Sequence, residues 1–377
     1  MSQSAVLFEE LPVSKGKRLA KITLNRAKAL NAIDLEMIMA IFQQLQQWRS
    51  QPDIVAVWLE GEGGRAFCAG GDIRKLYLML TEQSDHRLEH ATVFFQHEYQ
   101  LDYLIHTYPK PIICWGSGIV MGGGLGLMVG ASHRIVTETS QIAMPEINIG
   151  LYPDVSGTWF LSRLPSDLGC FIGLTGAALN AADSIRLGFA DYFISTELKA
   201  ECLDTLIQAD WEQTDTANKV LVGRLLKPLE KQAWRHLPAS KIVEHWQSIR
   251  LLFGLASLLD IDVAVKYHAA KPEDDWLTGT LQSYINGCPT TAWIVWEQIQ
   301  RGRHLSLADA FQLELILSVQ CCLHPDLAEG VRARLIDRDN QPGWYYKSVA
   351  EVPTEWVEGH FQAPWAEDVN PLKHLLK

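Results

Sequence analysis

The sequence has no uncharged apolar stretch of about eighteen residues, so it predicts no membrane-spanning helix and no membrane partner. It also has no basic run to offset its formal net charge of −11, which argues against a nucleic-acid partner. None of its seven cysteines forms a Cys-x-x-Cys pair, and Cys321 and Cys322 are adjacent, which is poor geometry for a disulfide. Met1–Glu10 lacks the pattern of a secretory signal. We therefore expect reduced thiols and a cytoplasmic protein.

Motifs that the sequence lacks disfavour three kinds of enzyme. The absence of Gly-x-Ser-x-Gly excludes a thioesterase of the α/β-hydrolase type. Gly116-Ser117-Gly118 starts like a dinucleotide fingerprint, but Met121 takes the third glycine position, so no nicotinamide cofactor is expected. His86 and His90 are spaced for one helix face, yet no third ligand accompanies them, and we expect no metal. We expect no other resident cofactor.

Short apolar runs alternate with helical patterns in the first half of the chain, which predicts an α/β core. Strands are predicted over Leu19–Leu24, Ile54–Leu59, Ile112–Trp115 and Ile135–Thr137. Asp34 is placed to cap a helix, and a second helical pattern covers His86–His106. Beyond about residue 200 strand signals fade and long helical patterns such as Leu307–Leu323 take over. We predict a catalytic core over 1–200 and a helical C-terminal region over 201–377, with an approximate boundary.

Two glycine-rich turns are the most informative feature of the chain. One contains Gly70 and Gly71, the other contains Gly122 and Gly123, and each follows a short apolar run. Both turns are predicted as a strand, a tight turn and a helix start. Glycine lets a backbone approach a ligand closely, and a helix start offers free N–H donors. Two such donors aimed at one carbonyl oxygen would form an oxyanion hole.

Several motifs together resemble those of the crotonase, or enoyl-CoA hydratase/isomerase, superfamily. They are the runs Asn25–Ala32, Phe67–Asp72 and Gly122–Gly124, in the order and approximate spacing of that superfamily. Within it, the chain is most similar to the subgroup that hydrolyses 3-hydroxyisobutyryl-CoA. That similarity is carried by the segments Ala143–Gly157, Cys288–Thr290 and Glu329–Asp339. The resemblance covers nearly the whole chain and is weakest at about 200–275.

The resemblance implies a spiral fold of repeated β-β-α units with a helical tail, assembled into trimers or hexamers. It implies that an acyl-CoA substrate binds with its thioester oxygen between the N–H groups of Gly71 and Gly123. Gly70 and Gly122 would bind substrate beside them. The alternative is that all four glycines only serve tight turns that need a positive φ.

Two basic residues near these turns are candidates for the phosphates of CoA. Lys28 and Arg74 stand where members of the superfamily often meet the phosphates or the adenine, and a cation is a suitable partner for phosphate. The alternative is that each is an ordinary solvated charge, because most lysines and arginines are exposed.

The resemblance also separates hydrolysis from hydration. Hydratases of the superfamily carry a glutamate at the position of Gly126, which has no side chain to hold a water. The second hydratase glutamate is retained as Glu146, and Asp154 follows as in the hydrolase subgroup. Glu146 is expected either to attack the thioester carbonyl or to activate water. Asp154 is expected to hold the substrate's 3-hydroxyl group, and Glu98 matches a position that binds substrate in the subgroup.

These carboxylates also have structural alternatives. Glu146 could cap a helix, Asp154 could start a turn, and Glu98 could be an exposed helix residue. Arg332, in the tail motif, is expected to be structural and to pair with Asp337 or a neighbouring subunit.

The sequence therefore predicts a hydrolase of a short branched 3-hydroxyacyl-CoA thioester, with 3-hydroxyisobutyryl-CoA in valine breakdown as the substrate. One alternative is an enoyl-CoA isomerase or hydratase of the same superfamily, because one carboxylate base and an oxyanion hole can also move a double bond. Another is a non-catalytic protein that binds acyl-CoA, since fold does not fix function. The preferred acyl chain, the choice between nucleophile and general base for Glu146, and the number of subunits are left open.

Overall fold

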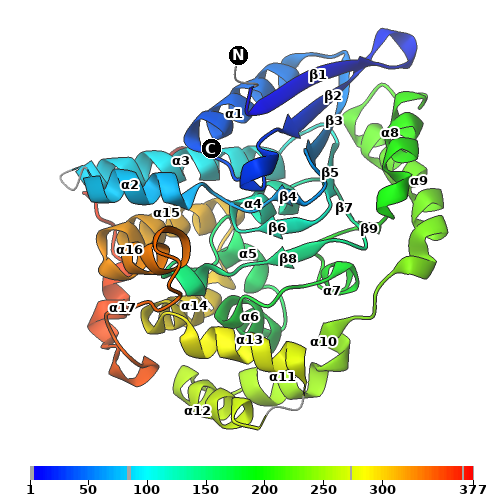
Figure 1. Ribbon diagram of the computed structural model, residues 1–377. Coiled ribbons are helices and arrows are strands. Elements are labelled where there is room, and N and C mark those ends of the chain that lie inside the picture. Colours follow the sequence, from blue (N-terminus) through cyan, green and yellow to red (C-terminus); the bar gives the residue numbers. More distant parts are fainter. Residues whose placement is uncertain (1–3, 83–85, 272–273, 367–368, 377) are drawn as a thin grey trace. The chain divides into compact units, whose positions relative to one another are not determined.

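The protein is described by a computed structural model that covers residues 4–82, 86–271, 274–366 and 369–376 (Figure 1). The chain forms two compact units, and each is described by itself. The first unit comprises Met1–Gly71, Gln100–Ile142 and Ala178–Val243, and the second comprises Asp72–Tyr99, Ala143–Ala177 and Glu244–Lys377. Over the described ranges, no helix combines the length and the apolar character needed to cross a membrane.

A six-stranded sheet forms the centre of the first unit. Its strands lie in the order β1-β2-β3-β5-β7-β9, with β1 antiparallel to β2 and the other neighbours parallel. They are β1 (Val6–Pro12), β2 (Arg18–Leu24), β3 (Ile54–Gly61), β5 (Ile112–Gly116), β7 (His133–Val136) and β9 (Tyr192–Phe193). This confirms the predicted strands and the α/β class.

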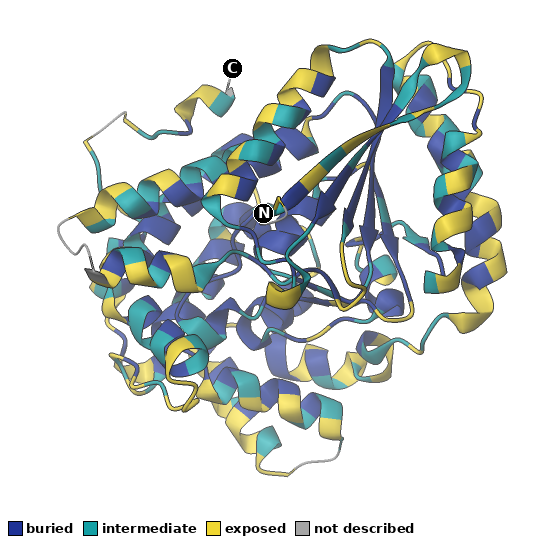
Figure 2. Cartoon of the chain, turned by 45° about the horizontal axis from the view of Figure 1, so that its top comes forward, coloured by how far each residue is buried: buried dark blue, intermediate teal, exposed yellow. Residues whose placement is uncertain are grey.

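The strands inside this sheet are more buried than the strand at its edge. The interior strand β3 is buried along nearly its whole length, whereas the edge strand β1 is exposed or half-buried at every position after Val6 (Figure 2). Parallel strands are covered on both faces and therefore read as continuous apolar runs. Helix α1 (Leu35–Ser50) contacts β1, and α9 (Asp215–Ala233) contacts β3 and β9. The side chain of Asp34 accepts a hydrogen bond from the Met37 N–H (3.0 Å), which confirms the predicted cap.

A small second sheet carries the glycine turns. Its order is β4-β6-β8, from β4 (Ala66–Cys68), β6 (Ile119–Met121) and β8 (Gln141–Ala143), and β4 is parallel to β6. The turn with Gly70 follows β4, and the turn with Gly122 follows β6 and opens α4 (Gly123–Val129). The predicted order of strand, turn and helix is therefore confirmed for both glycine turns. The preceding strands are these three-residue ones, however, and not the longer apolar runs that form β3 and β5.

Helices account for the second unit and for the rest of the first. The other helices of the first unit are α7 (Ala181–Arg186) and α8 (Lys199–Ile207), and α10 (Lys241–Glu244) lies where the chain passes to the second. The second unit has α2 (Ile73–Glu82), α3 (Arg87–His106) up to Tyr99, η4 (Glu146–Ile149), α5 (Gly157–Leu161), α6 (Ser166–Thr175), α11 (Trp246–Phe253), α12 (Leu258–Ala269), α13 (Asp275–Asn286), α14 (Pro289–Gly302), α15 (Leu307–Leu323), α16 (Pro325–Val331) and α17 (Thr354–His360). Helix α6 contacts α11, α13 and α14, so it is central to this unit.

The two units are interleaved along the chain, whereas the sequence predicts one boundary near residue 200. The first unit continues to Val243 because α9 packs on β9 and so stays with the large sheet. The segment Ala143–Ala177 instead joins the C-terminal helices. Past residue 200, the described part of the chain contains helices and no strand, which confirms the helical C-terminal region.

Helix α16 packs directly on η4, the short segment that begins at Glu146. A Cβ added at Gly330 of α16 would lie 2.4 Å from the carbonyl carbon and oxygen of Ile149. Gly150 has a φ of +74°, and a Cβ there would lie 2.5 Å from the Asp326 carbonyl oxygen. Only glycine allows so close an approach, so part of the tail motif Glu329–Asp339 holds the Glu146 segment in place.

We predict that Gly330→Ala destabilises the protein by about 1–3 kcal/mol, because the backbone of Ile149 must shift to admit the methyl group. The matched control is Gly359→Ala in α17, where a Cβ meets nothing within 4 Å. Removing glycine from that open helical position should be neutral or stabilising by up to about 1 kcal/mol. Urea unfolding of the three proteins measures both effects. Equal stability of the two variants would contradict the close packing at Gly330.

Candidate active site

The two glycine turns of the first unit lie against each other. Since β4 and β6 are parallel neighbours, the turns that follow them emerge at the same edge of the small sheet. A Cβ added at Gly70 would lie 3.2 Å from the Met121 carbonyl oxygen and 3.7 Å from the Gly123 nitrogen. Gly70 (φ +108°) and Gly122 (φ +48°) both have the positive φ that favours glycine. The structure thus brings Gly70, Gly122 and Gly123 together.

The backbone around these turns is held by several contacts. Gly71 forms a parallel bridge with Ile33, whose N–H donates to the Gly70 carbonyl (2.9 Å). As the first residue of α4, Gly123 has an N–H with no acceptor inside the helix. A Cβ at Gly124 would lie 2.2 Å from the Cys68 carbonyl oxygen, so the two turns are packed too tightly for any side chain there. These features suit N–H groups that are fixed before a ligand arrives.

Asn31 explains why the motif Asn25–Ala32 accompanies the glycine turns. Its buried side-chain amide donates to the carbonyl oxygens of Glu62 and Ala66, each at 2.9 Å. Its side-chain oxygen accepts from the Arg26 N–H (2.9 Å), and its own φ is +57°. The residue therefore ties the loop before α1 to the start of β4.

Three carboxyl groups gather in the second unit. Glu98 lies on α3, Glu146 begins η4, and Asp154 lies later in the same motif, Ala143–Gly157. Their exposed fractions are 2%, 5% and 4%, so all three are buried. The Asp154 Oδ2 atom accepts a hydrogen bond from the Tyr99 hydroxyl (2.7 Å). Glu146 Oε2 is buried and has no hydrogen-bond partner among the residues that the structure describes.

The electrostatics of these groups follow from burial and mutual repulsion. Burial, and then the nearby Asp154, hold the pKa of Glu98 well above its usual range. Burial raises the pKa of Glu146 in the same direction, with smaller contributions from Asp154 and Glu98. Burial also raises the pKa of Asp154 to about 6, although the Tyr99 hydrogen bond opposes that rise. In the described part of the chain, no lysine or arginine contributes to these three shifts. Carboxyl groups with raised pKa values suit proton transfer near neutral pH.

The structure tests the structural alternatives for the carboxylates. Pro145 is the cap residue of η4, so Glu146 is not a helix cap. Glu98 is not an exposed helix residue. Asp154 does begin a turn, since its carbonyl accepts from the Gly157 N–H (2.6 Å), but its side chain is buried against Tyr99. Of the three structural alternatives, only the turn at Asp154 is confirmed. That turn uses the backbone carbonyl of Asp154 and not its carboxylate.

The two candidate phosphate-binding residues are exposed and lie in different units. Lys28 is exposed on the short helical turn Ala27–Ala29 of the first unit. Arg74 is exposed on α2 of the second unit, and its guanidinium donates to the Leu335 carbonyl (2.5 Å). That bond gives Arg74 a structural contact with the tail. A role for either residue in binding CoA stays a prediction.

Sequence reasoning missed the groups that support the carboxyl cluster. Glu314 on α15 is fully buried, and Tyr99, Tyr152 and Ser318 form hydrogen bonds around Asp154. One signal was present, because Glu314 interrupts the otherwise apolar run Leu313–Leu317. A lone acid in such a run is rarely buried unless it is paired.

The remaining subgroup motifs are structural in this chain. Arg332 contacts Glu329 (2.8 Å), Asp337 (2.6 Å) and Asp339 (2.7 Å), which confirms the predicted pair with Asp337. Cys288 caps α14, since its Sγ atom accepts from the Thr291 N–H (3.5 Å).

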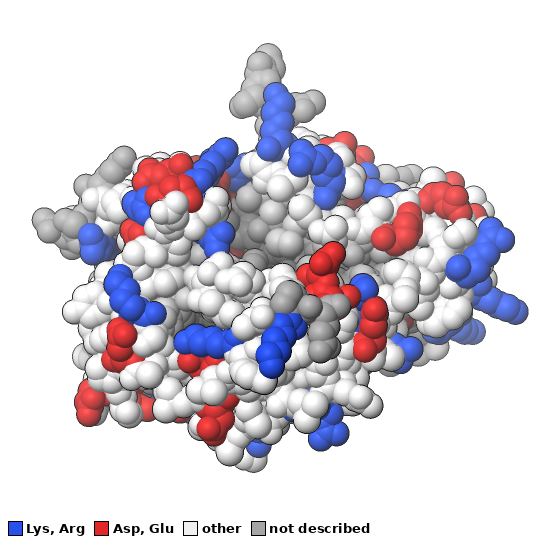
Figure 3. Space-filling model, turned by 60° about the horizontal axis from the view of Figure 1, so that its bottom comes forward, with Lys and Arg blue, Asp and Glu red and all other residues white. Residues whose placement is uncertain are grey.

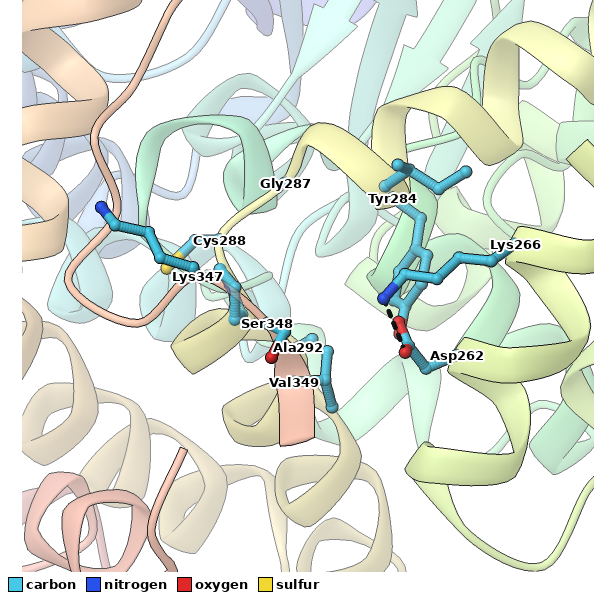
Figure 4. A pocket seen from close by; sticks show the side chains of 11 residues that line it. Asp262, Lys266, Tyr284, Gly287, Cys288, Ala292, Lys347, Ser348 and Val349 are labelled. Carbon is cyan, nitrogen blue, oxygen red and sulfur yellow. Dashed lines mark hydrogen bonds and ion pairs between the residues drawn. The ribbon is translucent and has the colours of Figure 1, made fainter. Parts of the chain in front are cut away.

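Cys288 also lines a cavity of about 30 Å³, which has room for little more than a water molecule (Figure 4). There Lys266 pairs with Asp262 (2.8 Å), which also accepts from the Tyr284 hydroxyl (3.1 Å), and Lys347 points away from that pair (Figure 4). Asp262 and Lys266 thus neutralise each other, and the Lys347 ammonium donates to the Trp344 carbonyl (2.5 Å), so we assign no ligand to this small cavity.

Two further features bear on metals and nucleic acids. Glu244, His245 and Asp274 place ligand-type atoms within 4.8 Å of one another. Asp274, however, caps α13 through the Leu277 N–H (2.9 Å) and pairs with His245 (3.2 Å), so the cluster has a structural role. On the face drawn in Figure 3, acidic and basic side chains are interspersed, without a broad basic field. The predictions of no metal and no nucleic-acid partner stay predictions.

Comparison with known proteins places the chain in a family. A family model described as enoyl-CoA hydratase/isomerase matches residues 19–361. The chain belongs to this family. A family member from zebrafish (Danio rerio), named 3-hydroxyisobutyryl-CoA hydrolase, mitochondrial, is 38% identical over 96% of this chain and 90% of its own. The human protein of the same name is 34% identical over 98% of this chain and 92% of its own.

A solved structure of the family agrees with this assignment. The enoyl-CoA hydratase from Rhodobacter sphaeroides 2.4.1 superimposes with a TM-score of 0.82 at 31% identity, over 98% of this chain and 99% of that one. The predicted resemblance to the crotonase superfamily, the similarity to 3-hydroxyisobutyryl-CoA hydrolases and the fold class are thereby confirmed.

The raised pKa values make the carboxyl cluster a source of instability at high pH. A carboxyl group whose pKa is higher in the folded state stabilises the fold below its unfolded pKa, and this contribution is lost as pH rises through the folded pKa. We therefore predict that Glu98→Gln stabilises the protein at about pH 8 and has less effect at about pH 5.

Glu89→Gln, an exposed change on the same helix α3, is the control and should have little effect at either pH. Thermal unfolding at the two pH values makes the comparison. A Glu98→Gln variant less stable than the parent at pH 8 would contradict the raised pKa of Glu98.

Proposed function

We propose that this protein hydrolyses a short branched 3-hydroxyacyl-CoA thioester, with 3-hydroxyisobutyryl-CoA as the substrate in valine breakdown. The observation that carries the proposal is the unpartnered, buried Oε2 atom of Glu146 in a cluster with Asp154 and Glu98. The zebrafish and human relatives are named for this activity, and they align over nearly the whole chain. The products would be 3-hydroxyisobutyrate and CoA.

Each group has a chemical task in this proposal. The N–H groups of Gly71 and Gly123 polarise the thioester carbonyl and stabilise its developing negative charge. Gly70 and Gly122, beside them, keep side chains away from the acyl group. CoA departs readily because a thiol has a pKa of about 8.5. No cofactor takes part in these steps, so we propose that none is required.

Glu146 can supply the chemistry in two ways. As a nucleophile, its carboxylate oxygen bonds to the acyl carbon, the C–S bond breaks, and water then hydrolyses the mixed anhydride. As a general base, it takes a proton from the water that attacks the same carbon. Asp154 accepts a hydrogen bond from the 3-hydroxyl group in both routes, and Glu98 supports substrate binding beside it.

Hydration is the less suitable reaction for this site, although the solved relative from Rhodobacter sphaeroides is named enoyl-CoA hydratase. Hydratases of the superfamily use two glutamates, and Gly126 stands at the position of the first. Glycine has no acid or base to add water across a double bond. The choice of hydrolysis therefore depends on one missing carboxylate and on the retained Asp154.

The compartment and the assembly are also proposals. All seven cysteines are free and buried, which suits a reducing compartment, and we propose the cytoplasm. Because the zebrafish and human relatives are named mitochondrial, cell fractionation with markers for both compartments is the appropriate test. The proposed trimer or hexamer is tested by light scattering on the eluting protein.

We predict that Glu146→Gln lowers the rate of CoA release from 3-hydroxyisobutyryl-CoA by about 10²-fold or more, because the amide is neither a base nor a nucleophile. Binding of the CoA ester should persist, since the side-chain volume is kept. Free CoA is followed with a thiol reagent, and binding by titration calorimetry. Glu89→Gln again serves as the control. Undiminished CoA release by Glu146→Gln would remove Glu146 from the chemistry.

The raised pKa values also predict the pH dependence of the reaction. Glu146 must be ionised to act, so kcat/KM should rise with pH through a pKa well above the value of about 4.3 for free glutamate. Asp154, with a pKa of about 6, would contribute to the same acid limb. The measurement is kcat/KM between about pH 5 and pH 9. A profile that stays flat down to about pH 5 would contradict the raised pKa values.

A further inference from the structure

We infer that Glu314 and Ser318, one turn apart on α15, position Asp154 and thereby set the preference for a hydroxylated acyl group. This inference rests on the proposed function. Asp154 lies at the start of a turn. Glu314 holds the backbone of this turn, and Ser318 holds the Asp154 side chain through the Tyr99 hydroxyl. Residues spaced by four share one helix face, so a single helix can hold both ends of Asp154.

Glu314 holds the backbone that follows Asp154. Its Oε2 atom accepts from the Ser156 N–H and its Oε1 atom from the Thr158 N–H, each at 2.8 Å. Both carboxylate oxygens are therefore used, and the side chain has no exposure to solvent. Burial and the nearby Asp154 raise the pKa of Glu314 to about 8, although the two N–H bonds oppose that rise.

The turn that Glu314 holds needs such support. Val155 (φ +48°) and Ser156 (φ +75°) are consecutive non-glycine residues in the left-handed region. A positive φ is unusual for any residue other than glycine and is a genuine outlier for a β-branched one such as Val155. Strained residues of this kind persist where their surroundings over-determine them, and they cluster at functional sites. Without its two acceptors, the turn would relax and move Asp154.

Ser318 holds the other end of Asp154 through a chain of hydroxyl groups. The Tyr99 hydroxyl donates to Asp154 Oδ2 (2.7 Å) and lies 2.5 Å from the Ser318 hydroxyl. Ser318 is in turn 2.9 Å from the Tyr152 hydroxyl, which donates to the Glu314 carbonyl (2.7 Å). All four groups are buried, so each hydroxyl has a defined partner within the protein.

A purely structural role for Glu314 explains less. A buried carboxyl group is an expensive support for a fold, because burial and the neighbouring Asp154 both disfavour its charged form. Apart from Glu314 and Ser318, the buried positions of α15 carry apolar residues, such as Phe311, Leu315 and Val319. The strained turn beside Asp154 explains why a carboxyl group stands at position 314. The proposed binding of the substrate's 3-hydroxyl group by Asp154 in turn explains the strained turn.

The test compares two substrates that differ only in the 3-hydroxyl group, 3-hydroxyisobutyryl-CoA and isobutyryl-CoA. The parent protein should prefer the hydroxylated thioester in kcat/KM, since a site built to bind a hydroxyl rejects the analogue that lacks it. Asp154→Ala should abolish that preference. Glu314→Gln, with one acceptor oxygen in place of two, should lower it by about tenfold or more, because a displacement of about 1 Å is enough to lose such a contact.

A merely structural role would lower kcat/KM for both thioesters equally and leave their ratio unchanged, which overturns the inference. Glu297→Gln on α14, whose side chain pairs with Arg301 (3.2 Å), is the matched control and should keep the parent ratio. If Glu314→Gln fails to fold, Ser318→Ala replaces it. That change removes the hydroxyl behind Tyr99 and should also lower the ratio.

The outcomes separate this inference from the proposed function. If the parent protein releases CoA from neither thioester, the proposed hydrolysis is wrong. The ratio of the two binding constants, measured by titration calorimetry, then takes the place of the kinetic ratio. A parent protein with no preference in either measurement, or a folded Glu314→Gln variant with the parent preference, overturns the positioning role.

Discussion

The burial of three neighbouring carboxyl groups, those of Glu98, Glu146 and Asp154, is the constraint on which the second unit depends. Burial disfavours the charged form of each group, and neighbouring acids disfavour it further at Glu98 and Glu146. A fold selected only for stability would replace such groups with apolar residues. Their presence requires supports that keep each carboxyl group in one place. The Tyr99 hydroxyl, the Glu314 carboxylate and the packing of α16 on η4 are those supports.

The first unit provides a complementary kind of group, which is the backbone N–H. Its small parallel sheet brings two glycine turns together, and the absence of side chains at Gly70 and Gly124 lets the turns touch. Backbone donors of this kind stabilise a developing oxyanion without any change in their own charge. In the proposed hydrolysis, such donors would bind the oxygen of the thioester carbonyl.

The sequence predicts the regular elements well because their signals are local. The strand β2, the cap at Asp34 and the bounds of α15 follow from periodicity and capping within a few residues. The strands β4 and β6 were missed because three residues are too few to show a period. The interleaving of the two units was missed because it depends on contacts such as that of α9 with β9, which no local pattern encodes.

In the candidate site, too, residues within one local motif were predicted and residues joined only by long-range contacts were not. Glu146 and Asp154 were found because they belong to one short motif, and the structure places both in the buried cluster with Glu98. Glu314 and Ser318 were missed because they lie far along the chain from Asp154 and Tyr99. Tyr99 and Ser318, for example, are 219 positions apart. A solitary acid in an apolar helix was their only local trace.

The most direct test of the account compares two reactions of the unmodified protein. Purified protein is given 3-hydroxyisobutyryl-CoA in one assay, where a thiol reagent reports free CoA. It is given crotonyl-CoA in another, where loss of the conjugated double bond reports hydration. The account predicts rapid release of CoA in the first assay and no hydration in the second, since Gly126 supplies no second carboxylate. Hydration of crotonyl-CoA with 3-hydroxyisobutyryl-CoA left intact would contradict it.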